Sequence, residues 1–257
     1  MTGLPHAANL GVGPTTPSAT GGRHTGTCEA GTKAGSNDKV VPARKLPHGL
    51  TPFVRPRRLR TSVPMRRLVA ETRWSPEQLI LPVFVRDGIS EPVEIPSMPG
   101  QYQHTPESLA QLGREAADAG IGGMIVFGVP TDADKDETGS AAWDPNGIQN
   151  RGIAALADAV GDQLVVMADT CLDETTSHGH CGPLRPDGVV DNDWAVSCYA
   201  ATAVSQARAG AAAVGPSGMM DGQVAAIREA LDEAGYSDVA IMAYSCLLYT
   251  SPSPRDA

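Results

Sequence analysis

Three residues in the stretch ADTCLDETTSHGHCG, residues 168–182, have side chains that commonly bind metal ions. Cys171 and Cys181 offer soft thiolates, and Asp173 between them offers a hard carboxylate. Such a mixed set is compatible with zinc and tolerates harder cations, and a flexible loop lets ligands ten residues apart converge. His180, next to Cys181, could be a further ligand or a hydrogen-bonding neighbour of one. The stretch therefore predicts a metal site formed by Cys171, Asp173 and Cys181.

Two more polar residues are expected beside this loop. Asp169 directly follows an apolar run, residues 164–168, and an acid there could orient a substrate amine or a reactive lysine; loop capping is the alternative. Ser217 lies on a glycine-flanked turn after the next predicted strand and could bind a substrate, whereas Asp221 is expected to be the N-cap of the following helix. Because α/β proteins build sites at the carboxyl ends of their strands, we predict supporting catalytic roles for Asp169 and Ser217.

Strands and helices must alternate along residues 79–245 to position these side chains. Apolar runs predict strands at residues 79–85, 122–129, 164–169, 211–217 and 239–245. Thr105 and Pro106 are typical of a helix start, and the helix that opens at residues 191–193 is expected to bury one face, consisting of Trp194, Cys198, Ala201 and Val204. The order of the elements predicts five consecutive β-α units.

Near-continuous apolar strands that alternate with helices predict a parallel sheet covered by helices, and hence the α/β class. A doubly wound sheet and a (β/α)8 barrel both fit this pattern. No G-x-G-x-x-G follows the first strand, which weakens the dinucleotide-binding version of the former. Polar residues after several different strands favour a TIM (β/α)8-type barrel, of which the chain would hold about the first five units.

Composition limits the classes of function. The net charge is −9, and basic residues gather in residues 1–60 while the remainder is acidic, which argues against nucleic-acid binding by the core. No apolar run approaches the ~18 residues of a membrane span and no signal peptide opens the chain, so we expect a cytoplasmic protein without a membrane partner. The five cysteines are an odd count that suits thiols or metal ligands better than a disulfide framework.

Changes in amino-acid composition along the chain predict four segments. Residues 1–50 are rich in small polar residues, Gly and Pro, which predicts a disordered N-terminal extension. Residues 51–75 carry the basic run RPRRLR and are expected to be an N-terminal arm on an acidic neighbouring subunit. Residues 76–245 would form the partial barrel domain. Residues 246–257 are unlike a further β-α unit and are expected to be a non-native tail.

Five motifs of the chain resemble the porphobilinogen synthase family, also called 5-aminolaevulinate dehydratase: RPRRLRTSVPMRRLVAET, LILPVFV, FGVP…KDETGS, ADTCLDETTSHGHCG and GPSGMMDGQV. The resemblance extends over residues 55–245. It implies a TIM-type barrel lyase that condenses two molecules of 5-aminolaevulinate to porphobilinogen in tetrapyrrole (haem) biosynthesis. It also implies a homo-octamer in which the arm embraces a neighbouring subunit.

Two departures from the family pattern affect the chemistry. Asp173 stands where zinc-dependent members have the middle cysteine of C-x-C, which shifts the site toward the magnesium-type pattern; we expect Zn2+, with Mg2+ as the alternative. The family also forms Schiff bases on two lysines, the first expected just after AYS at residues 243–245. None of the four lysines matches either position: Lys33, Lys39, Lys45 and Lys135. We therefore expect a chain truncated after the fifth strand and inactive alone.

Two alternatives to this function stay open. The first is a non-catalytic fragment that associates with full-length subunits. The second is another metal-dependent barrel enzyme, such as a hydrolase, although such sites usually recruit several histidines and the sequence after residue 181 has none.

Overall fold

A computed structural model describes residues 56–245; the expected disordered extension, the expected non-native tail, Cys28 and Cys246 all lie outside the described residues. Contacts divide the chain into two units, Met1–Arg66 and Arg67–Ala257. The described end of the first unit holds the 3-10 helix η1, Pro56–Arg60, and the beginning of the short helix α1, Val63–Leu68, and neither element buries a residue.

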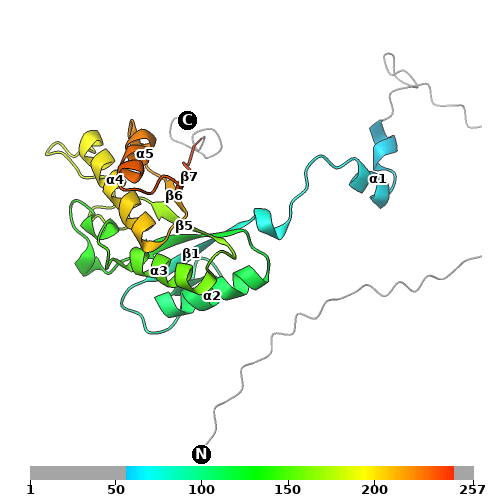
Figure 1. Cartoon of the computed structure of the whole chain (residues 1–257), viewed down its shortest axis with the longest axis horizontal. Helices are drawn as coiled ribbons and strands as arrows, with labels where there is room; N and C mark the ends of the chain where they lie inside the picture. Colours follow the sequence, from blue (N-terminus) through cyan, green and yellow to red (C-terminus); the bar gives the residue numbers. More distant parts are fainter. Residues whose placement is uncertain (1–55, 246–257) are drawn as a thin grey trace, which may run out of the picture. The chain divides into compact units, whose positions relative to one another are not determined.

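A seven-stranded sheet is the centre of the second unit (Figure 1). Its order is β2-β3-β1-β4-β5-β6-β7, and every neighbouring pair is parallel except β2 with β3. The strands are β1 Ile80–Arg86, β2 Val93–Glu94, β3 Tyr102–His104, β4 Gly123–Val129, β5 Val165–Thr170, β6 Ala213–Pro216 and β7 Ala240–Ile241.

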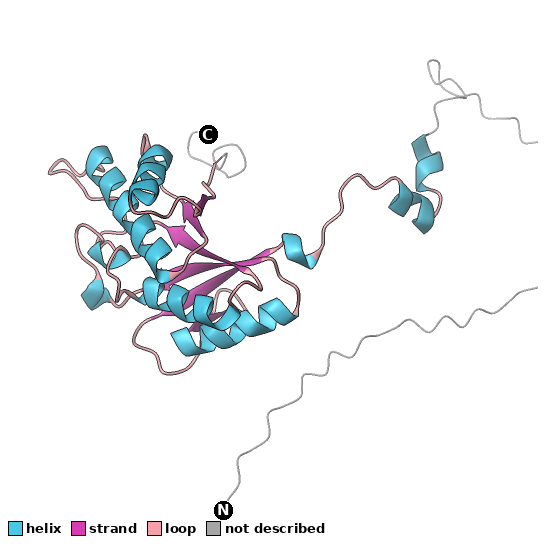
Figure 2. Ribbon diagram, in the orientation of Figure 1, coloured by secondary structure: helices cyan, strands magenta, loops and turns pink. Residues whose placement is uncertain are grey.

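One helix connects each strand to the next from β3 onward, and these helices cover one face of the sheet (Figure 2). They are α2 Pro106–Asp118, α3 Ile148–Val160, α4 Asn192–Ala209 and α5 Gln223–Glu233, with short 3-10 turns η2 Pro76–Gln78, η3 Asp132–Asp134 and η4 Ser140–Ala142. From β1 through β4 to β7 each new strand is added on the same side, so right-handed crossovers place every helix on the same face. A doubly wound sheet would reverse its order and use both faces. The predicted α/β class and partial (β/α)8-type arrangement are confirmed.

The helix-covered face holds most of the apolar core. One cluster joins α2 and α3 to β1, β4 and β5, and a second joins α4 and α5 to β6 and to the loop after β5. Fully buried side chains include Leu109, Met124, Ile153, Leu156, Tyr199, Ile227 and Leu231. The predicted cap is also present, since the Thr105 hydroxyl accepts a hydrogen bond from the Ser108 amide at the start of α2. These contacts fix the strands whose ends carry the site.

The opposite face of the sheet corresponds to the interior of a barrel. Ile125, Met167 and Ala213 form a small cluster there with Phe127, whose ring lies 5.5 Å from that of Phe84. Side chains alternate along a strand, so Asp169, two residues after Met167, belongs to this face. The barrel-type arrangement therefore directs the predicted catalytic acid toward the interior.

The structure corrects the sequence-based prediction for α4. Ala195, Cys198 and Tyr199 face the core, whereas Trp194 is 50% exposed and Ala201 is also exposed. The prediction was right for Cys198 and Val204, which pack in the second apolar cluster, and wrong for Trp194 and Ala201. Because α4 is rich in alanine and carries small apolar residues on all sides, periodicity does not reveal which face is buried.

Two further predictions need correction, and one pair of strands was missed. The helix after β6 is capped by Gly222 in a left-handed conformation, with φ 82°, and not by Asp221, which is exposed. The last predicted strand, residues 239–245, is regular only at Ala240–Ile241. The antiparallel pair β2 and β3 was missed, because strands of two and three residues are too short to show an alternating pattern.

Candidate active site and metal centre

The loop after β5 turns sharply at Leu172. This side chain is fully buried, and its carbonyl oxygen accepts hydrogen bonds from the amides of Thr175 at 3.0 Å and Thr176 at 2.8 Å. The turn leaves Cys171 buried at the end of the strand and places Asp173 and Glu174 beside it. An apolar anchor thus holds three potential donors in a segment that is otherwise polar.

Cys171, Asp173 and Glu174 form one group of potential metal ligands. The Cys171 sulfur and one carboxylate oxygen from each acid all lie within 4.8 Å of one another. A tetrahedrally coordinated cation has bonds of about 2.0–2.3 Å to such ligands, so its ligand atoms must lie closer to one another than 4.8 Å. Small side-chain rotations would bring the three donor atoms to that separation. One thiolate with two carboxylates fits a borderline cation such as Zn2+ and also accommodates a harder one.

Cys181 lies outside that group but is coupled to it. The hydrogen bond between the two thiols lowers the pKa of Cys181 to about 7 and raises the pKa of Cys171 far above its ordinary value. At neutral pH Cys181 therefore has substantial thiolate character, which is the form that binds metals and reacts as a nucleophile. The lowered pKa of Cys181, the second thiol of the predicted set, is therefore compatible with a role as metal ligand.

The two carboxyl groups of the loop share one proton. Burial raises the pKa of Glu174 to about 9, and the adjacent Asp173 adds to the shift as hydrogen-bond partner and as charge. Burial acts in the same direction on Asp173, but hydrogen bonds from Glu174 and Cys171 outweigh it and hold its pKa below the ordinary value. Bound positive charge would favour ionisation of both groups, so this pair suits a cation.

Asp169 and Ser217 meet at the ends of β5 and β6. The Ser217 hydroxyl donates a long hydrogen bond of 3.5 Å to Asp169 Oδ2, and Asp169 is 3% exposed. Burial raises the pKa of Asp169 to about 7; the Ser217 hydroxyl opposes the shift and the charge of Asp173 adds to it. A carboxyl group with this pKa exchanges its proton near neutrality, as a general acid or base must.

Two tyrosines complete the surroundings of the loop. Tyr199, fully buried on α4, has its hydroxyl 3.4 Å from the Cys171 sulfur. The ring of Tyr244 lies against β6, since a Cβ added at Gly215 would be 3.4 Å from its Cε2. Burial raises the pKa of the Tyr244 hydroxyl, with the charges of Asp169 and Cys171 adding to the shift. Both phenols are therefore neutral hydrogen-bonding groups beside the acids.

The loop after β4 is hydrogen-bonded to the loop after β5 through Asp136. Its amide donates to the Thr175 carbonyl at 3.2 Å, and its carbonyl accepts from the Ser177 amide at 2.8 Å. Its carboxylate accepts hydrogen bonds from the backbone amides of Thr138 and Gly139 and from the Ser140 hydroxyl. Burial alone would raise the pKa of Asp136, but these hydrogen bonds hold it well below its usual range. A charged aspartate thus shapes one loop and pairs with the other.

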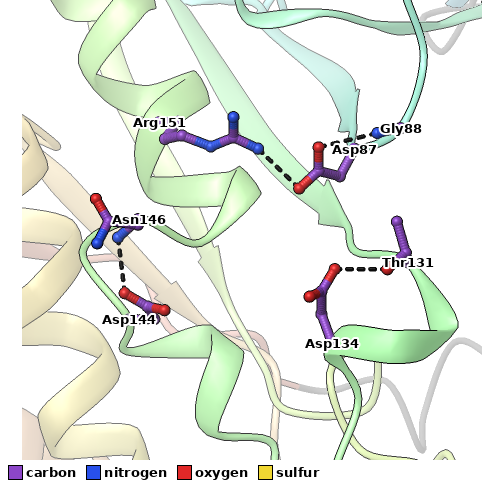
Figure 3. Close-up of polar contacts among 7 residues, drawn as sticks. All are labelled: Asp87, Gly88, Thr131, Asp134, Asp144, Asn146 and Arg151. Carbon is purple, nitrogen blue, oxygen red and sulfur yellow. Dashed lines mark hydrogen bonds and ion pairs between the residues drawn. The ribbon is translucent and has the colours of Figure 1, made fainter.

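A second acidic region, shown in Figure 3, is not a donor set of this kind. It borders a hollow of about 150 Å³ and includes Asp87, Asp134 and Asp144. Each carboxylate already has a partner: Arg151 at 2.8 Å, the Thr131 hydroxyl at 2.6 Å and the Asn146 amide at 2.8 Å, respectively. These acids shape the turns after β1 and β4.

The structure brings the predicted site residues to one edge of the sheet. Cys171 and Asp173 share a donor group, Cys181 and Cys171 shift each other's pKa, and Asp169 contacts Ser217. His180 is exposed, and the donor group of the described residues does not include it.

Sequence reasoning missed three residues around the loop. Glu174 lies next to Asp173 in DET, a signal that was available. Tyr199 was obscured by the wrong phase of α4, and Tyr244 carries no local signal because its ring meets β6 only through the fold.

Comparison with known proteins bears on this arrangement. Residues 53–252 match the sequence profile of a family described as Delta-aminolevulinic acid dehydratase. The chain is 58% identical over 194 residues to the Delta-aminolevulinic acid dehydratase of Mycobacterium leprae and 54% identical over 198 residues to that of Streptomyces coelicolor. These alignments cover 76% and 77% of this chain but only 59% and 60% of those proteins.

A solved structure is similar as well. The Toxoplasma gondii delta-aminolevulinic acid dehydratase, in complex with the reaction product porphobilinogen, superposes with a TM-score of 0.72 at 41% identity. The match covers 75% of this chain and 55% of that one. The chain therefore spans little more than half the length of the proteins it resembles.

Proposed function

The chain belongs to the Delta-aminolevulinic acid dehydratase family, which is the porphobilinogen synthase family that its motifs predicted. From this premise we propose that it is part of a lyase that condenses two molecules of 5-aminolaevulinate to porphobilinogen. The observation that carries the proposal is the convergence of Asp169, Cys171, Asp173 and Ser217 at the carboxyl ends of β5 and β6. This membership removes the reason to consider an unrelated metal-dependent barrel enzyme.

We assign the metal to the loop after β5, with Cys171, Asp173 and Cys181 as ligands and Glu174 as an additional oxygen donor. The thiolates favour Zn2+, and the carboxylates would also accept Mg2+. A cation there supplies Lewis-acid polarisation of a substrate carbonyl or amine. The donor atoms within 4.8 Å and the lowered pKa of Cys181 support this assignment.

Asp169 and Ser217 bind and orient the substrate in this proposal. With a pKa near neutrality, the Asp169 carboxyl can accept a proton from a substrate amine and return it, while the Ser217 hydroxyl holds the acid in place. The buried phenol of Tyr199 lies 3.4 Å from the Cys171 sulfur, and once that sulfur is a thiolate the phenol would donate a hydrogen bond to it and steady it for coordination.

The amines that would form Schiff bases are not among the described residues. Lys135 is the one lysine there, and its ammonium pairs with Asp132 at 3.1 Å. We propose that the 257-residue chain alone does not form porphobilinogen, because none of its four lysines matches the Schiff-base positions of the family. Purified chain incubated with 5-aminolaevulinate and Zn2+ is expected to yield no pyrrole product.

A chimera tests the proposed chemistry directly. Residues 1–245 are joined to the C-terminal part of the Mycobacterium leprae dehydratase, which is 58% identical over the matched region. We expect the chimera to form porphobilinogen from 5-aminolaevulinate, and Asp169→Asn in it to lower kcat by roughly 10²–10⁴-fold, as for loss of a general acid-base group. A folded chimera that binds Zn2+ but forms no product would refute the proposal.

Partners follow from the same family assignment. We propose a homo-oligomer, an octamer as in the family, in which the basic segment of residues 51–75 contacts an acidic neighbouring subunit. The arginines of η1 and α1 support this, since Arg57, Arg60 and Arg66 line one exposed hollow. Within residues 56–245, no helix has the length and apolarity needed to cross a membrane. The cytoplasmic location stays a prediction.

A further inference from the structure

Strands β4 and β5 separate at the point where the site begins. They pair from Gly123 with Val165 to Val126 with Ala168. Beyond that point β4 continues beside β1 as far as Val129, and β5 continues beside β6 as far as Thr170. The fork leaves backbone groups without a neighbouring strand just before Cys171, and a buried backbone group without a partner is costly.

Two glutamine side chains fill this fork. The Gln149 Nε2 group, from the first turn of α3, donates to the Val126 carbonyl at 2.9 Å and to the Asp169 carbonyl at 2.7 Å. The Gln206 Nε2 group, from α4, donates to the same Asp169 carbonyl at 2.7 Å and to Gln149 Oε1 at 3.2 Å. The Thr170 hydroxyl donates to Gln206 Oε1 at 2.7 Å. Each amide thus has its two donors and its acceptor satisfied.

The backbone of β4 is shaped to admit this pair. A Cβ added at Gly128 would lie 2.7 Å from the Cβ and 3.3 Å from the Cα of Gln149, closer than real side chains come. Gly128 therefore allows the start of α3 to approach β4 closely enough for the Gln149 amide to reach both strands. Gln206 is fully buried, so its contacts are not exchanged with solvent.

We propose that Gln149 and Gln206 are positioning residues that set the direction of the Asp169 carboxyl and the Cys171 thiolate. Their amides hold the Asp169 carbonyl, which lies on the same residue as the catalytic acid and two residues before the first metal ligand. A fully satisfied buried network of this kind specifies one arrangement of the groups it joins. The inference rests on the proposed metal site, and its test separates the two.

The test compares isosteric variants of the full 257-residue chain. Gln149→Met and Gln206→Met remove the amides but keep the side-chain size. Asn150→Leu is the matched control: Asn150 follows Gln149 on α3, is 2% exposed, and its side-chain amide donates to the Asp144 carbonyl and to the Ser205 hydroxyl instead of to β5. Co2+ is the probe, because thiolate-to-cobalt charge-transfer absorption reports ligand geometry as well as affinity.

We expect both glutamine variants to raise the Kd for Co2+ by about 10–100-fold, as loss of groups that orient metal ligands does, and to weaken the charge-transfer band. Asn150→Leu should lower stability but change the Kd by less than about threefold. Unchanged Co2+ binding in the glutamine variants, or an equal loss in the Asn150 variant, would overturn the proposal.

Hydrogen exchange over residues 166–172 provides a readout that needs no metal. If the unsubstituted chain fails to bind Co2+, the metal assignment falls while the positioning role is still decided. Faster exchange in the glutamine variants, and not in Asn150→Leu, would support the role. Equal exchange in all chains would refute it.

Discussion

The three cysteines of the described residues have different chemical environments. Cys181 shares a hydrogen bond with Cys171, which lowers the pKa of Cys181 to about 7, whereas burial and the charge of Asp136 raise the pKa of Cys198 to about 11. Cys198 packs in the second apolar cluster, as the sequence predicted. At the scale of single residues, hydrogen bonding and desolvation separate the proposed ligands from a structural thiol.

Substitution of single cysteines tests this distinction. Cys171→Ser should weaken Zn2+ binding by more than about 100-fold, because removing a ligand costs more than removing a group that only orients one. Cys198→Ser replaces an equally buried thiol outside the donor group and should change the affinity by less than about threefold. Competition with a chromogenic chelator measures both, and equal affinities in the two variants would contradict the ligand assignment.

At the scale of elements, the site depends on contacts between consecutive βα loops. The backbone of Asp136 pairs with residues 175–177, and its carboxylate organises the turn that follows. Gly139 takes φ 76° in that turn, and a Cβ there would be 2.8 Å from the Thr175 hydroxyl. The KDETGS motif therefore holds the loop after β5 in position.

Loss of the Asp136 charge should weaken these contacts between the two loops. We expect Asp136→Asn to lower the free energy of unfolding by about 1–3 kcal/mol at pH 7, the usual cost of leaving buried hydrogen-bonding groups poorly paired. Asp132→Asn is the control in the same loop: its side chain is 98% exposed and its ion pair with Lys135 should contribute about 0.5 kcal/mol or less. Urea denaturation measures both values.

The same pair of variants has a pH signature. Hydrogen bonds hold the pKa of Asp136 below its ordinary value of 3.8, so the folded state favours the ionised form. The resulting stability is present above the unfolded pKa and is lost as the pH falls through the folded pKa. Below about pH 4 the unsubstituted chain should lose more stability than Asp136→Asn. Parallel pH profiles would show that Asp136 makes no ionised contribution.

At the scale of the whole molecule, the interior face of the sheet stays partly uncovered by the described residues. Ile80 and Val165 alternate with core residues on β1 and β5 and are 42% and 46% exposed, and Met242 and Tyr244, just after β7, are 36% and 37% exposed. Exposed apolar side chains that gather on one face mark an interaction site or an aggregation liability. An uncovered interior face fits the open alternative of a fragment that associates with full-length subunits.

Self-association through this face is testable. We expect sedimentation to show concentration-dependent association of the chain, which Ile80→Thr and Val165→Thr reduce because they make the interior face more polar. Val224→Thr is the matched control, since Val224 is similarly exposed, at 43%, but lies on α5. Equal association of all three variants would place the contact elsewhere.

The sequence by itself determined most of the longer elements and the identity of the family. Apolar runs located β1, β4, β5 and β6, the Thr105 cap located α2, and the spacing of Cys171, Asp173 and Cys181 predicted a metal site in the loop after β5. These features are local in the chain, so side-chain type and period suffice to predict them.

The tertiary structure decided which side chains meet. Glu174 joins the donor group because Leu172 is buried, and Tyr199 reaches the Cys171 sulfur because α4 packs with a phase that its alanine-rich sequence does not reveal. Gln149 and Gln206, 57 residues apart, meet only at the fork between β4 and β5. Such contacts depend on how strands diverge and helices rotate in the packed fold, and no periodicity along the chain encodes them.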